Sequence, residues 1–509
     1  MSWYTVARHE PSTPAIVDGT QTLTFGQLRS VVARITAGFD KMGVAAGHTV
    51  AVVLPNCWEL LAIELAALST ERYFLPINHH LTADEIAYIL GNSAPSVVVT
   101  NNELLDVVEA AAGQVTDSAF DHVQTTGPGV HAFDRVWAHL PDRDPEVRRA
   151  GSVVYYSSGT TGRPKGIRRP LSGTTPEQES DASQVAWAKL QVAPGPGVHV
   201  AVAPLYHAAP NGMALGALGR GVTVVIAPGK RFDAARFLSL ADEVGMTESF
   251  MVPTMFVRLL QLPPAQREAF DPSLLRCVVH AGAPCPISVK QHMISWWGPI
   301  VSEFYGSTES SVTTTVTSAE WLDAPGTVGG ARPGCRIEIH DRQGSVLPPG
   351  DEGLICIIGS QPFEYIGDPG KTQESWVDGG LVLGDIGRLD EAGRLFVLDR
   401  RSDLILTGGV NVYPAEIELA LSNHPQVQDI VVIGMPDDEW GQRVLALVQP
   451  AEGVDRNALA EDLAAYASPI LAKFKQPREY RIVDEIPRMP TGKVNRTAIR
   501  ERQIDSGQA

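Results

Sequence analysis

The sequence predicts an α/β protein with a large N-terminal domain of layered α/β subdomains, a small β-barrel unit and a small α+β C-terminal domain. Helix-like and strand-like segments alternate along most of the chain. From about Ala331 the pattern changes to short strands separated by Gly, Asp and Pro turns. A self-contained group of helices and strands follows Arg400. We therefore expect two domains, residues 1–400 and 401–509.

The N-terminal region alternates between the two patterns in order. Apolar residues at helical spacing predict helices over 23–43, 57–70 and 82–94. Gly43 is a good stop for the first helix, and Thr82 with Glu85 forms a capping sequence for the third. Short β-branched runs predict strands over 48–56, 73–78, 95–100, 198–204, 222–228, 249–253 and 275–282. Helices after Tyr206 and from Ala234 complete a pattern typical of parallel sheet covered on both faces.

The rest of the chain reads differently. Residues 335–359 alternate strands and turns, which predicts an antiparallel β unit. Beyond the boundary we expect helices over 414–424 and 456–471 and strands over 427–436, 443–450 and 478–483. The last residues, 505–509, are expected to be frayed.

Composition limits the functional classes. The chain has 509 residues and a formal net charge of −17, which disfavours nonspecific nucleic-acid binding, so no nucleic-acid partner is expected. We find no signal-peptide pattern and no apolar run long enough to span a bilayer. The cysteines are scattered without a C-x-x-C pair, and we expect reduced thiols in a cytoplasmic protein. They are Cys57, Cys277, Cys285, Cys335 and Cys356.

A glycine-rich loop, "YYSSGTTGRPKGIRR", runs from Tyr155 to Arg169. Glycines let backbone N–H groups converge on an anion, hydroxyl groups add donors, and a lysine adds a charge suited to phosphate. This is not the nucleotide-binding P-loop, because neither Ser nor Thr follows Lys165. Taken alone, a glycine-rich stretch of this kind favours a surface turn with one solvated lysine. The candidate phosphate-binding residues are Ser157, Ser158, Gly159, Thr160, Thr161, Gly162, Lys165 and Gly166.

Four further segments carry residues that are candidates for binding or catalysis. They are "APLYHAAPNG" with His207, "FYGSTES" with Tyr305, Gly306, Thr308 and Glu309, a segment with Asp385, Arg400, Gly408 and Gly409, and "PRMPTGKVNR" with Lys493. With the glycine-rich loop, their order and contents resemble the adenylate-forming superfamily, which includes acyl-CoA synthetases, luciferases and the adenylation domains of peptide synthetases. The resemblance covers nearly the whole chain.

The resemblance implies a two-step reaction. A carboxylate attacks the α-phosphorus of ATP, and a nucleophile, most often the thiol of coenzyme A, then displaces AMP from the acyl-AMP. Attack by an anion on a polyanion needs donors and positive charge where negative charge accumulates. By resemblance, Lys493 would bridge the carboxylate and the α-phosphate, and Glu309 with Thr161 would bind Mg²⁺. The expected cofactors and cosubstrates are ATP, Mg²⁺ and coenzyme A.

The resemblance also implies the nucleoside-binding residues. Tyr305 would stack on adenine, and Asp385 would accept hydrogen bonds from the ribose hydroxyls, with Arg400 reaching the same sugar. Each residue has a structural alternative when it is considered alone, since Tyr305 could be a core aromatic and Asp385 a turn cap. Small residues would let the adenine lie against backbone, and the remaining nucleotide-binding candidates are Gly282, Ala283, Gly306 and Thr308.

The C-terminal domain is expected to be mobile. The Gly408–Gly409 loop resembles the family's pantetheine channel, whereas Lys493 serves the first step. Both cannot occupy one active site at once, so we expect rotation about a hinge at Arg401–Ser402.

Three departures from the family pattern stand out. Leu383 replaces a common Thr, Ser402 replaces a common Asp or Lys at the hinge, and the segment Arg168–Asp181 replaces a hydroxyl- or His-rich stretch. Arg168 and Arg169 are compatible either with phosphate binding or with surface charge.

The acid substrate is expected to be hydrophobic: aryl, fatty or polycyclic. In the related peptide-synthetase adenylation domains, an Asp near the position of His207 binds the substrate's α-ammonium. The segment after His207 carries no acid, so the resemblance disfavours an amino acid, and its Gly and Ala residues leave room for a bulky acid. His207 either gates the acyl pocket or is a buried imidazole. "SFMVPTMF" and "SSVTTTV" are expected to add walls. The leading hypothesis is an acyl-CoA ligase. The alternatives are an amide synthetase that uses an amine and a noncatalytic nucleotide-binding homologue, and the oligomeric state is left open, with a homodimer as one option.

Overall fold

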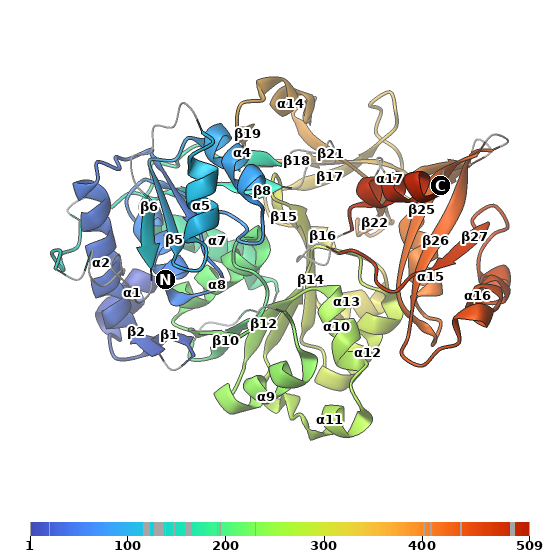
Figure 1. The fold of residues 1–509 in the computed structure, drawn as a ribbon, viewed down its shortest axis with the longest axis horizontal. Coiled ribbons are helices and arrows are strands. Elements are labelled where there is room, and N and C mark those ends of the chain that lie inside the picture. The colour runs from blue at the N-terminus through green and yellow to red at the C-terminus, as the bar shows by residue number, and fades with distance from the viewer. Residues whose placement is uncertain are drawn as a thin grey trace.

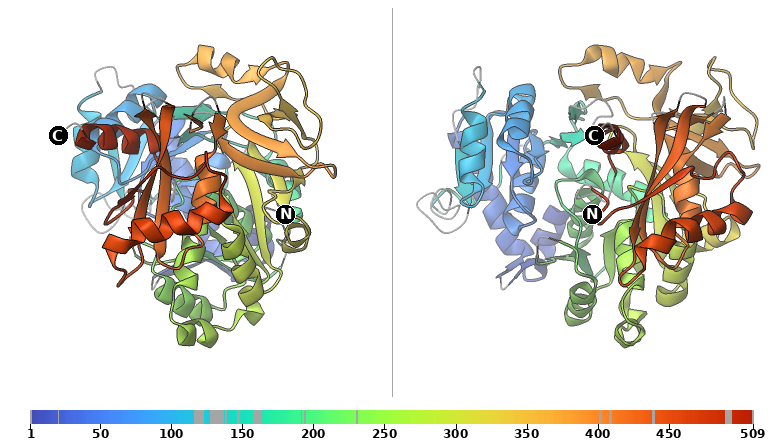
Figure 2. Two further views of the ribbon diagram at one scale, coloured as in Figure 1. Left: turned by 90° about the vertical axis from the view of Figure 1, so that its right-hand side faces the viewer. Right: turned by 45° about the vertical axis from the view of Figure 1, so that its right-hand side comes forward.

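The computed structural model describes most of the chain, and its architecture is drawn in Figures 1 and 2. The described residues are 2–19, 21–115, 123–126, 137, 139–145, 148–157, 164–190, 192, 195–229, 231–400, 403–407, 410–437, 440–488 and 494–507.

A nine-stranded sheet lies at the centre, in the order β16-β15-β14-β13-β12-β10-β11-β1-β2. The strands from β14 to β1 run parallel, and the outer strands pair antiparallel. The strands are β1 Pro14–Asp18, β2 Gln21–Thr24, β10 Val198–Ala201, β11 Thr223–Ile226, β12 Glu248–Met251, β13 Cys277–His280, β14 Val301–Ser307, β15 Ser311–Val316 and β16 Gly330–Ala331.

A second, wholly parallel sheet has the order β6-β5-β3-β4-β7. Its strands are β3 Thr49–Val53, β4 Tyr73–Pro76, β5 Val97–Asn101, β6 Val123–Thr126 and β7 Ser152–Val153. The prediction of parallel sheet is confirmed, but the alternating segments build two sheets.

The helices of this part follow the predicted pattern. Thr24 and Thr82 each form a complete capping box, with Gln27 and Glu85 respectively. The helices are α1 Trp3–His9, α2 Phe25–Lys41, α3 Trp58–Leu68, α4 Ala83–Ser93, α5 Leu105–Ala112, α7 Pro176–Ala188, α8 Ala208–Arg220, α9 Ala234–Val244, α10 Pro253–Leu260, α11 Pro264–Ala269, α12 Ile287–Trp297 and α13 Ser318–Asp323, with a 3₁₀ turn at Pro272–Leu274.

Helices between the two sheets bury one shared core. Residues of α1, α2, α3 and α8 pack with residues from both sheets in one cluster. The other face of the large sheet packs against α9, α10 and α12, and the other face of the small sheet packs against α4 and α5. Fully buried strands such as β3, in which every residue is apolar or Thr, fit this covering of both faces.

Two further units of the chain up to Arg400 are antiparallel. A three-stranded sheet contains β8 Tyr155–Ser157, β9 Lys165–Arg168 and β19 Glu364–Tyr365. The predicted antiparallel unit consists of β17 Arg336–His340, β18 Gly353–Ile358, β20 Trp376–Val377, β21 Gly380–Leu389 and β22 Leu395–Arg400, and α14 Pro369–Glu374 lies beside it.

The C-terminal elements gather at one side of the molecule, coloured orange to red in Figure 1 and facing the viewer in the left view of Figure 2. They are β23 Ile405–Thr407, β24 Val410–Val412, α15 Pro414–Leu421, β25 Val427–Asp437, β26 Gly441–Pro450, α16 Arg456–Ile470, β27 Glu479–Ile482 and α17 Arg496–Gly507. These elements have a core of their own, in which Val444, Ala446 and Val448 of β26 pack with Leu459 and Leu463 of α16. A separate core is typical of a domain, and the division of the chain near Arg400 stays a prediction.

One expectation about the C-terminus is wrong. Residues 505–507 are not frayed, because α17 continues to Gly507. The helix is held by packing that its weak sequence pattern does not reveal, since Ile499 is buried in a core with β25 and β26. Among the described residues, no helix is long and apolar enough to cross a membrane.

Candidate active site

The motif residues of the large sheet lie where its parallel strands end. His207 follows β10, Gly282 and Ala283 follow β13, and Glu309 follows β14. The carboxyl ends of parallel strands meet at the same edge of a sheet, which is where ligands bind in open α/β folds. The topology therefore brings together residues that are about 100 positions apart in the sequence.

The glycine-rich loop is carried by a hairpin. Ser157 on β8 pairs with Lys165 on β9, so the two ends of the loop are held side by side. A Cβ at Gly166 would lie 2.7 Å from the Tyr156 ring, so this glycine is required by packing inside the hairpin. The predicted phosphate-binding residues Ser158, Gly159, Thr160, Thr161 and Gly162 lie outside the described residues.

Lys165 and Glu309 are joined by a residue that the sequence did not reveal. The Lys165 ammonium lies 5.1 Å from the centre of the Tyr365 ring, and the Tyr365 hydroxyl donates a 2.8 Å hydrogen bond to Glu309 Oε1. Tyr365 reaches this position because β19 pairs with β9. Burial, followed by the charge of Glu309, raises the pKa of Tyr365. Tyr365 had no sequence signal, because the pairing of β19 with β9 joins segments about 200 residues apart.

The turn that carries Thr308 and Glu309 is held by hydrogen bonds from an arginine side chain. Arg169 donates to the carbonyl oxygens of Thr308 and Glu309 at 2.8 and 2.9 Å. Arg169 is therefore neither a free surface charge nor placed as a phosphate ligand by these contacts, whereas Arg168 pairs with Glu364 at the surface. At Gly306, a Cβ would lie 1.9 Å from the Ser311 carbonyl oxygen, so only glycine fits this bulge between β14 and β15.

Asp385 lies in an irregular stretch of β21. The register against β18 shifts between Leu354 and Cys356, and Gly384 beside it has φ +89°. Bulges commonly redirect side chains next to active sites. Here the redirected Asp385 is 7% exposed and accepts a 2.5 Å hydrogen bond from the Tyr305 hydroxyl.

Arg400 completes this group. It is the cross-strand partner of Asp385, and its Nε lies 3.2 Å from Asp385 Oδ1. Burial, reinforced by the charge of Asp385, raises the pKa of Tyr305 well above its ordinary value, so Tyr305 stays a hydrogen-bond donor. We call Tyr305, Asp385 and Arg400 the nucleoside triad. The structure brings these three predicted residues together.

After β13, one of the predicted nucleotide-binding residues has empty space beside its backbone. Gly282 has φ +89°, and no atom lies within 4 Å of where its Cβ would be. On α12, which follows this turn, the Lys290 ammonium donates a 2.6 Å hydrogen bond to Glu303 Oε2, and both side chains are buried. Burial lowers the pKa of neighbouring His280, with a further contribution from Lys290. The buried pair ties α12 to β14 and so supports the turn.

His207 is the N-cap residue of α8. Its ring lies 4.4 Å, centre to centre, from that of Tyr206, and the Tyr206 ring also lies 5.7 Å from that of His79. His79 follows β4 of the small sheet, so this row of rings joins the two sheets at their carboxyl edges. The predicted role of His207 as a gate stays a prediction.

A buried polar row next to His207 had no sequence signal. The Tyr155 hydroxyl donates to Asn211 Oδ1 at 2.7 Å, and Asn211 Nδ2 donates to Glu64 Oε2 at 2.7 Å. Glu64 is fully buried on α3, and burial raises its pKa to about 8, which the hydrogen bond from Asn211 only partly offsets. An acid therefore does lie beside the helix that follows His207, but near neutral pH it is mostly uncharged. We call Tyr155, Asn211 and Glu64 the helix row.

Several predicted residues are outside the described part of the chain. They are Lys493, Gly408, Gly409, Arg401 and Ser402. Their roles stay predictions.

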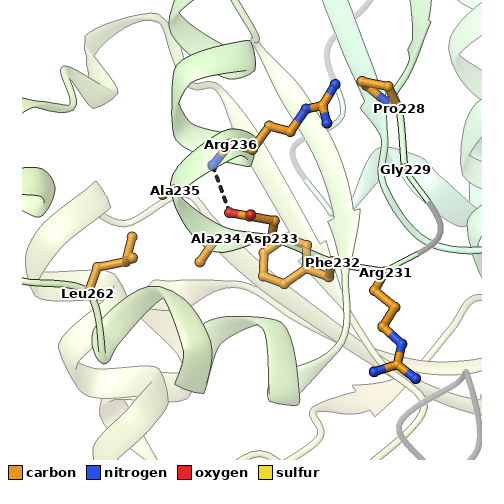
Figure 3. A pocket seen from close by; sticks show the side chains of 9 residues that line it. All are labelled: Pro228, Gly229, Arg231, Phe232, Asp233, Ala234, Ala235, Arg236 and Leu262. Carbon is orange, nitrogen blue, oxygen red and sulfur yellow. Dashed lines mark hydrogen bonds between the residues drawn. The ribbon is translucent and has the colours of Figure 1, made fainter.

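A cavity of about 490 Å³ lies away from the residues above, at the start of α9 (Figure 3). Arg231, Phe232 and Leu262 are among its lining residues, and the Asp233 side chain accepts a 3.0 Å hydrogen bond from the Arg236 backbone N–H. It shares no residue with the nucleoside triad or with the Lys165–Tyr365–Glu309 contact, so it does not define the candidate site.

Comparison with known proteins supports the motif pattern. Residues 3–365 match the AMP-binding enzyme family, and residues 416–493 match the AMP-binding enzyme C-terminal domain. A fatty acid–[acyl-carrier-protein] ligase, ScoC, from Streptomyces coeruleorubidus is 32% identical over 97% of this chain and 94% of its own. A feruloyl-CoA synthase from Amycolatopsis sp is 31% identical over 97% of both chains.

Solved structures agree with the fold. ATP-bound MatB from Rhodopseudomonas palustris has a TM-score of 0.86 and 28% identity, covering 99% of this chain and 100% of that one. The anthranilate CoA ligase AuaEII, in complex with anthranoyl-AMP, has a TM-score of 0.89 over 100% of this chain and 98% of its own. Its 22% identity supports the shared fold alone.

Proposed function

Because this chain belongs to the AMP-binding enzyme family of the adenylate-forming superfamily, we propose that it is an AMP-forming acyl-CoA ligase. It would join a carboxylic acid to AMP with release of pyrophosphate and then transfer the acyl group to coenzyme A. The observation that carries this proposal is the nucleoside triad, in which Asp385 lies in hydrogen-bond contact with Tyr305 and beside Arg400.

The triad supplies an anchor for the nucleoside. Asp385 has acceptor capacity beyond its contacts with Tyr305 and Arg400, because a carboxylate offers about four lone-pair sites. The ribose hydroxyls are donors that suit these sites. Held this way, the nucleotide would present its phosphates to the hairpin that carries Ser157 and Lys165, and orientation of this kind lowers the barrier without new chemistry.

The first step needs positive charge at the reacting phosphate. Lys165 and Lys493 are the proposed sources, Lys165 on the hairpin and Lys493 by resemblance. Lys493→Ala should strongly reduce pyrophosphate release while thioester formation from supplied acyl-AMP survives much better. If Lys493→Ala makes acyl-AMP at a near wild-type rate, this assignment is wrong.

Mg²⁺ binding is proposed at Glu309, with Thr161 as its companion. The donor set fits, since Mg²⁺ prefers oxygen ligands and Glu309 uses only Oε1 for Tyr365 among the described contacts. When bound, Mg²⁺ would neutralise phosphate charge. The protein's own part is to hold the carboxylate in place through Tyr365 and through Arg169 beneath the turn. Glu309→Gln should slow the first step and raise the Mg²⁺ concentration needed for half-maximal rate, and an unchanged Mg²⁺ titration would exclude a ligand role.

The acid is proposed to be hydrophobic. Met213 on α8 and Phe250 and Met251 on β12 are buried in one apolar cluster, so the segments expected to form the acyl pocket have an apolar interior. Glu64 does not restore the amino-acid hypothesis, because a carboxyl group with a pKa of about 8 offers little negative charge to an ammonium at pH 7.

The acceptor is best tested directly. Protein should be incubated with ATP, Mg²⁺ and a panel of fatty, aryl and polycyclic acids, without acceptor and then with coenzyme A or an amine. Pyrophosphate release reports the first step, and thioester formation only with coenzyme A supports the ligase. Amide formation would favour the alternative amide synthetase, and no pyrophosphate with any acid would favour a noncatalytic homologue. A cytoplasmic location is part of the proposal, and the five free cysteines are compatible with a reducing compartment.

Domain rotation is proposed for the second step. Few side-chain hydrogen bonds among the described residues join residues 1–400 to the C-terminal elements. They include Tyr413 to Glu352 at 3.0 Å and Ser288 to Asn423. Ser402→Pro, which restricts one backbone φ angle at the proposed hinge, should slow thioester formation more than pyrophosphate release. Equal loss in both steps would remove the hinge from this scheme.

A further inference from the structure

A cluster of potential metal ligands lies on the antiparallel unit, apart from the proposed active site. Glu338 and His340 are on β17, and Cys356 is on the neighbouring strand β18. Glu338 and Cys356 are direct cross-strand partners, and residues two apart on β17 point to the same face. The alternate residues Ile337, Ile339, Ile355 and Ile357 fill the core on the opposite face. Figure 1 shows β17, β18 and β21 side by side.

The side chains converge at the spacing of a coordination site. One ligand atom from each of the three residues lies within 4.8 Å of the others. His340 Nε2 and Glu338 Oε2 are 3.0 Å apart. Ligand atoms about 2.0–2.3 Å from a tetrahedral ion lie roughly 3–4 Å from each other, so small side-chain adjustments suffice.

The Cys356 thiol lies in a closely packed part of the cluster. Cys356 is fully buried, and it makes no hydrogen bond within the described part of the chain. A Cβ at Gly380 on β21 would lie 2.2 Å from Cys356 Sγ, so glycine at this position makes room for the sulfur. His340 is also buried, and the Glu338 side chain is 16% exposed, so the cluster reaches the surface at Glu338.

We infer that Glu338, His340 and Cys356 form a binding site for a borderline-soft divalent cation such as Zn²⁺. A sulfur, an imidazole nitrogen and a carboxylate oxygen together suit Zn²⁺ and not Mg²⁺ or Ca²⁺, which take oxygen ligands. Three protein ligands leave a fourth position for water. The site is separate from the proposed Mg²⁺ site at Glu309 and does not depend on ligase activity.

The positive charge of Arg336 is expected to weaken binding of the cation. The Arg336 guanidinium contacts Glu338 Oε1, while Oε2 faces His340. Binding would use Oε2, and the nearby positive charge would weaken it. Arg336→Ala should therefore tighten metal binding.

The test uses the full-length protein after treatment with a chelator. Co²⁺ replaces Zn²⁺ as a spectroscopic probe, because a thiolate ligand produces a charge-transfer absorption that oxygen and nitrogen ligands do not. Wild type should bind one equivalent with this absorption, and added Zn²⁺ should abolish it. Cys356→Ser should lose the band, and His340→Gln should weaken binding at least tenfold. Cys335→Ser, the matched control in the same unit, should keep both the absorption band and the affinity for Co²⁺.

The inference is overturned if wild type shows no thiolate–cobalt band, or if the band survives in Cys356→Ser. Loss of the band in Cys335→Ser would place the ion elsewhere and would also overturn it. Circular dichroism checks the fold of each variant. If Cys356→Ser does not fold, His340→Gln decides, and unchanged Co²⁺ affinity in that variant rejects the site.

Discussion

The nucleoside triad and the helix row use similar groups for different ends. In each, a tyrosine hydroxyl and a carboxyl group belong to one short hydrogen-bonded group. Asp385 lies beside the Arg400 guanidinium, whereas Glu64 has only the Asn211 amide and no charged partner among the described residues. A charged partner offsets the cost of burying a carboxylate, and an amide does so only in part, which is why burial raises the pKa of Glu64 to about 8. The first arrangement suits ligand binding, and the second suits a neutral link between helices.

The largest effect is expected on the use of ATP when the carboxylate of the nucleoside triad is removed. Asp385→Ala removes the proposed ribose acceptor and leaves Arg400 without its partner. We expect kcat/KM for ATP in pyrophosphate release to fall about 1000-fold, or ~4 kcal/mol, with little change in Tm. Asp385→Asn, which keeps one acceptor oxygen, should lose less. Normal ATP kinetics in Asp385→Ala would remove the triad from the nucleotide site.

The second prediction concerns the pH dependence of stability. Glu64 has a pKa of about 8 in the folded protein and an ordinary value of 4.5. Between these values the folded state holds the extra proton, so stability should fall as the pH rises from 4.5 towards 8. Glu64→Gln stays neutral and should lack this part of the decline. The difference between the two curves should change by on the order of 3 kcal/mol across the window.

Denaturant unfolding of both proteins at several pH values measures this difference. Parallel curves for wild type and Glu64→Gln would show that Glu64 does not titrate in this range. In that case the contrast with Asp385 would fail.

Removing one tyrosine hydroxyl from each group compares the nucleoside triad with the helix row directly. Tyr305→Phe keeps the ring proposed to stack on adenine but loses the bond to Asp385, so KM for ATP should rise about tenfold, or ~1.4 kcal/mol. Tyr155→Phe loses the bond to Asn211 and should cost about 1 kcal/mol of unfolding free energy with a smaller effect on ATP. The reverse pattern would show that the helix row, and not the triad, positions the nucleotide.

The smallest effect is expected at a part-buried pair of the same kind, in which Tyr413 is buried and Glu352 is exposed. Tyr413→Phe removes the 3.0 Å hydrogen bond to Glu352, which joins the C-terminal elements to the antiparallel unit. Because partly exposed hydrogen bonds contribute little, stability should change by less than about 1 kcal/mol. If this contact holds one arrangement of the two domains, the ratio of the two half-reaction rates should shift by up to about threefold in single-turnover experiments. An unchanged ratio would show that the contact does not bias the domains.

Much of the fold could be predicted because its signals are local. The capping box of Thr82 with Glu85 and the apolar run of β3 each lie within a few residues. The alternation of strands and helices indicated parallel sheet, but it could not show how the strands divide between two sheets. The continuation of α17 to Gly507 was missed because its packing on β25 comes from tertiary contacts.

The candidate site divides in the same way. Tyr305, Asp385 and Arg400 were predicted from motif order, and the structure brings them into contact. Tyr365 and Glu64 were missed, since neither lies in a motif and each acquires its partner from a distant segment.

By itself, the sequence determined the classes of element, the order of the motifs and the residue types available for an adenylating enzyme. These depend on local periodicity, capping and turn chemistry, which act over a few residues. Only the tertiary structure decided that Tyr365 joins Lys165 to Glu309, that Arg169 supports a turn, and that Glu64 is buried with an amide as its partner. The physical reason is that burial and charge partners depend on which segments pack together, and these set both the hydrogen bonds and the pKa of each group.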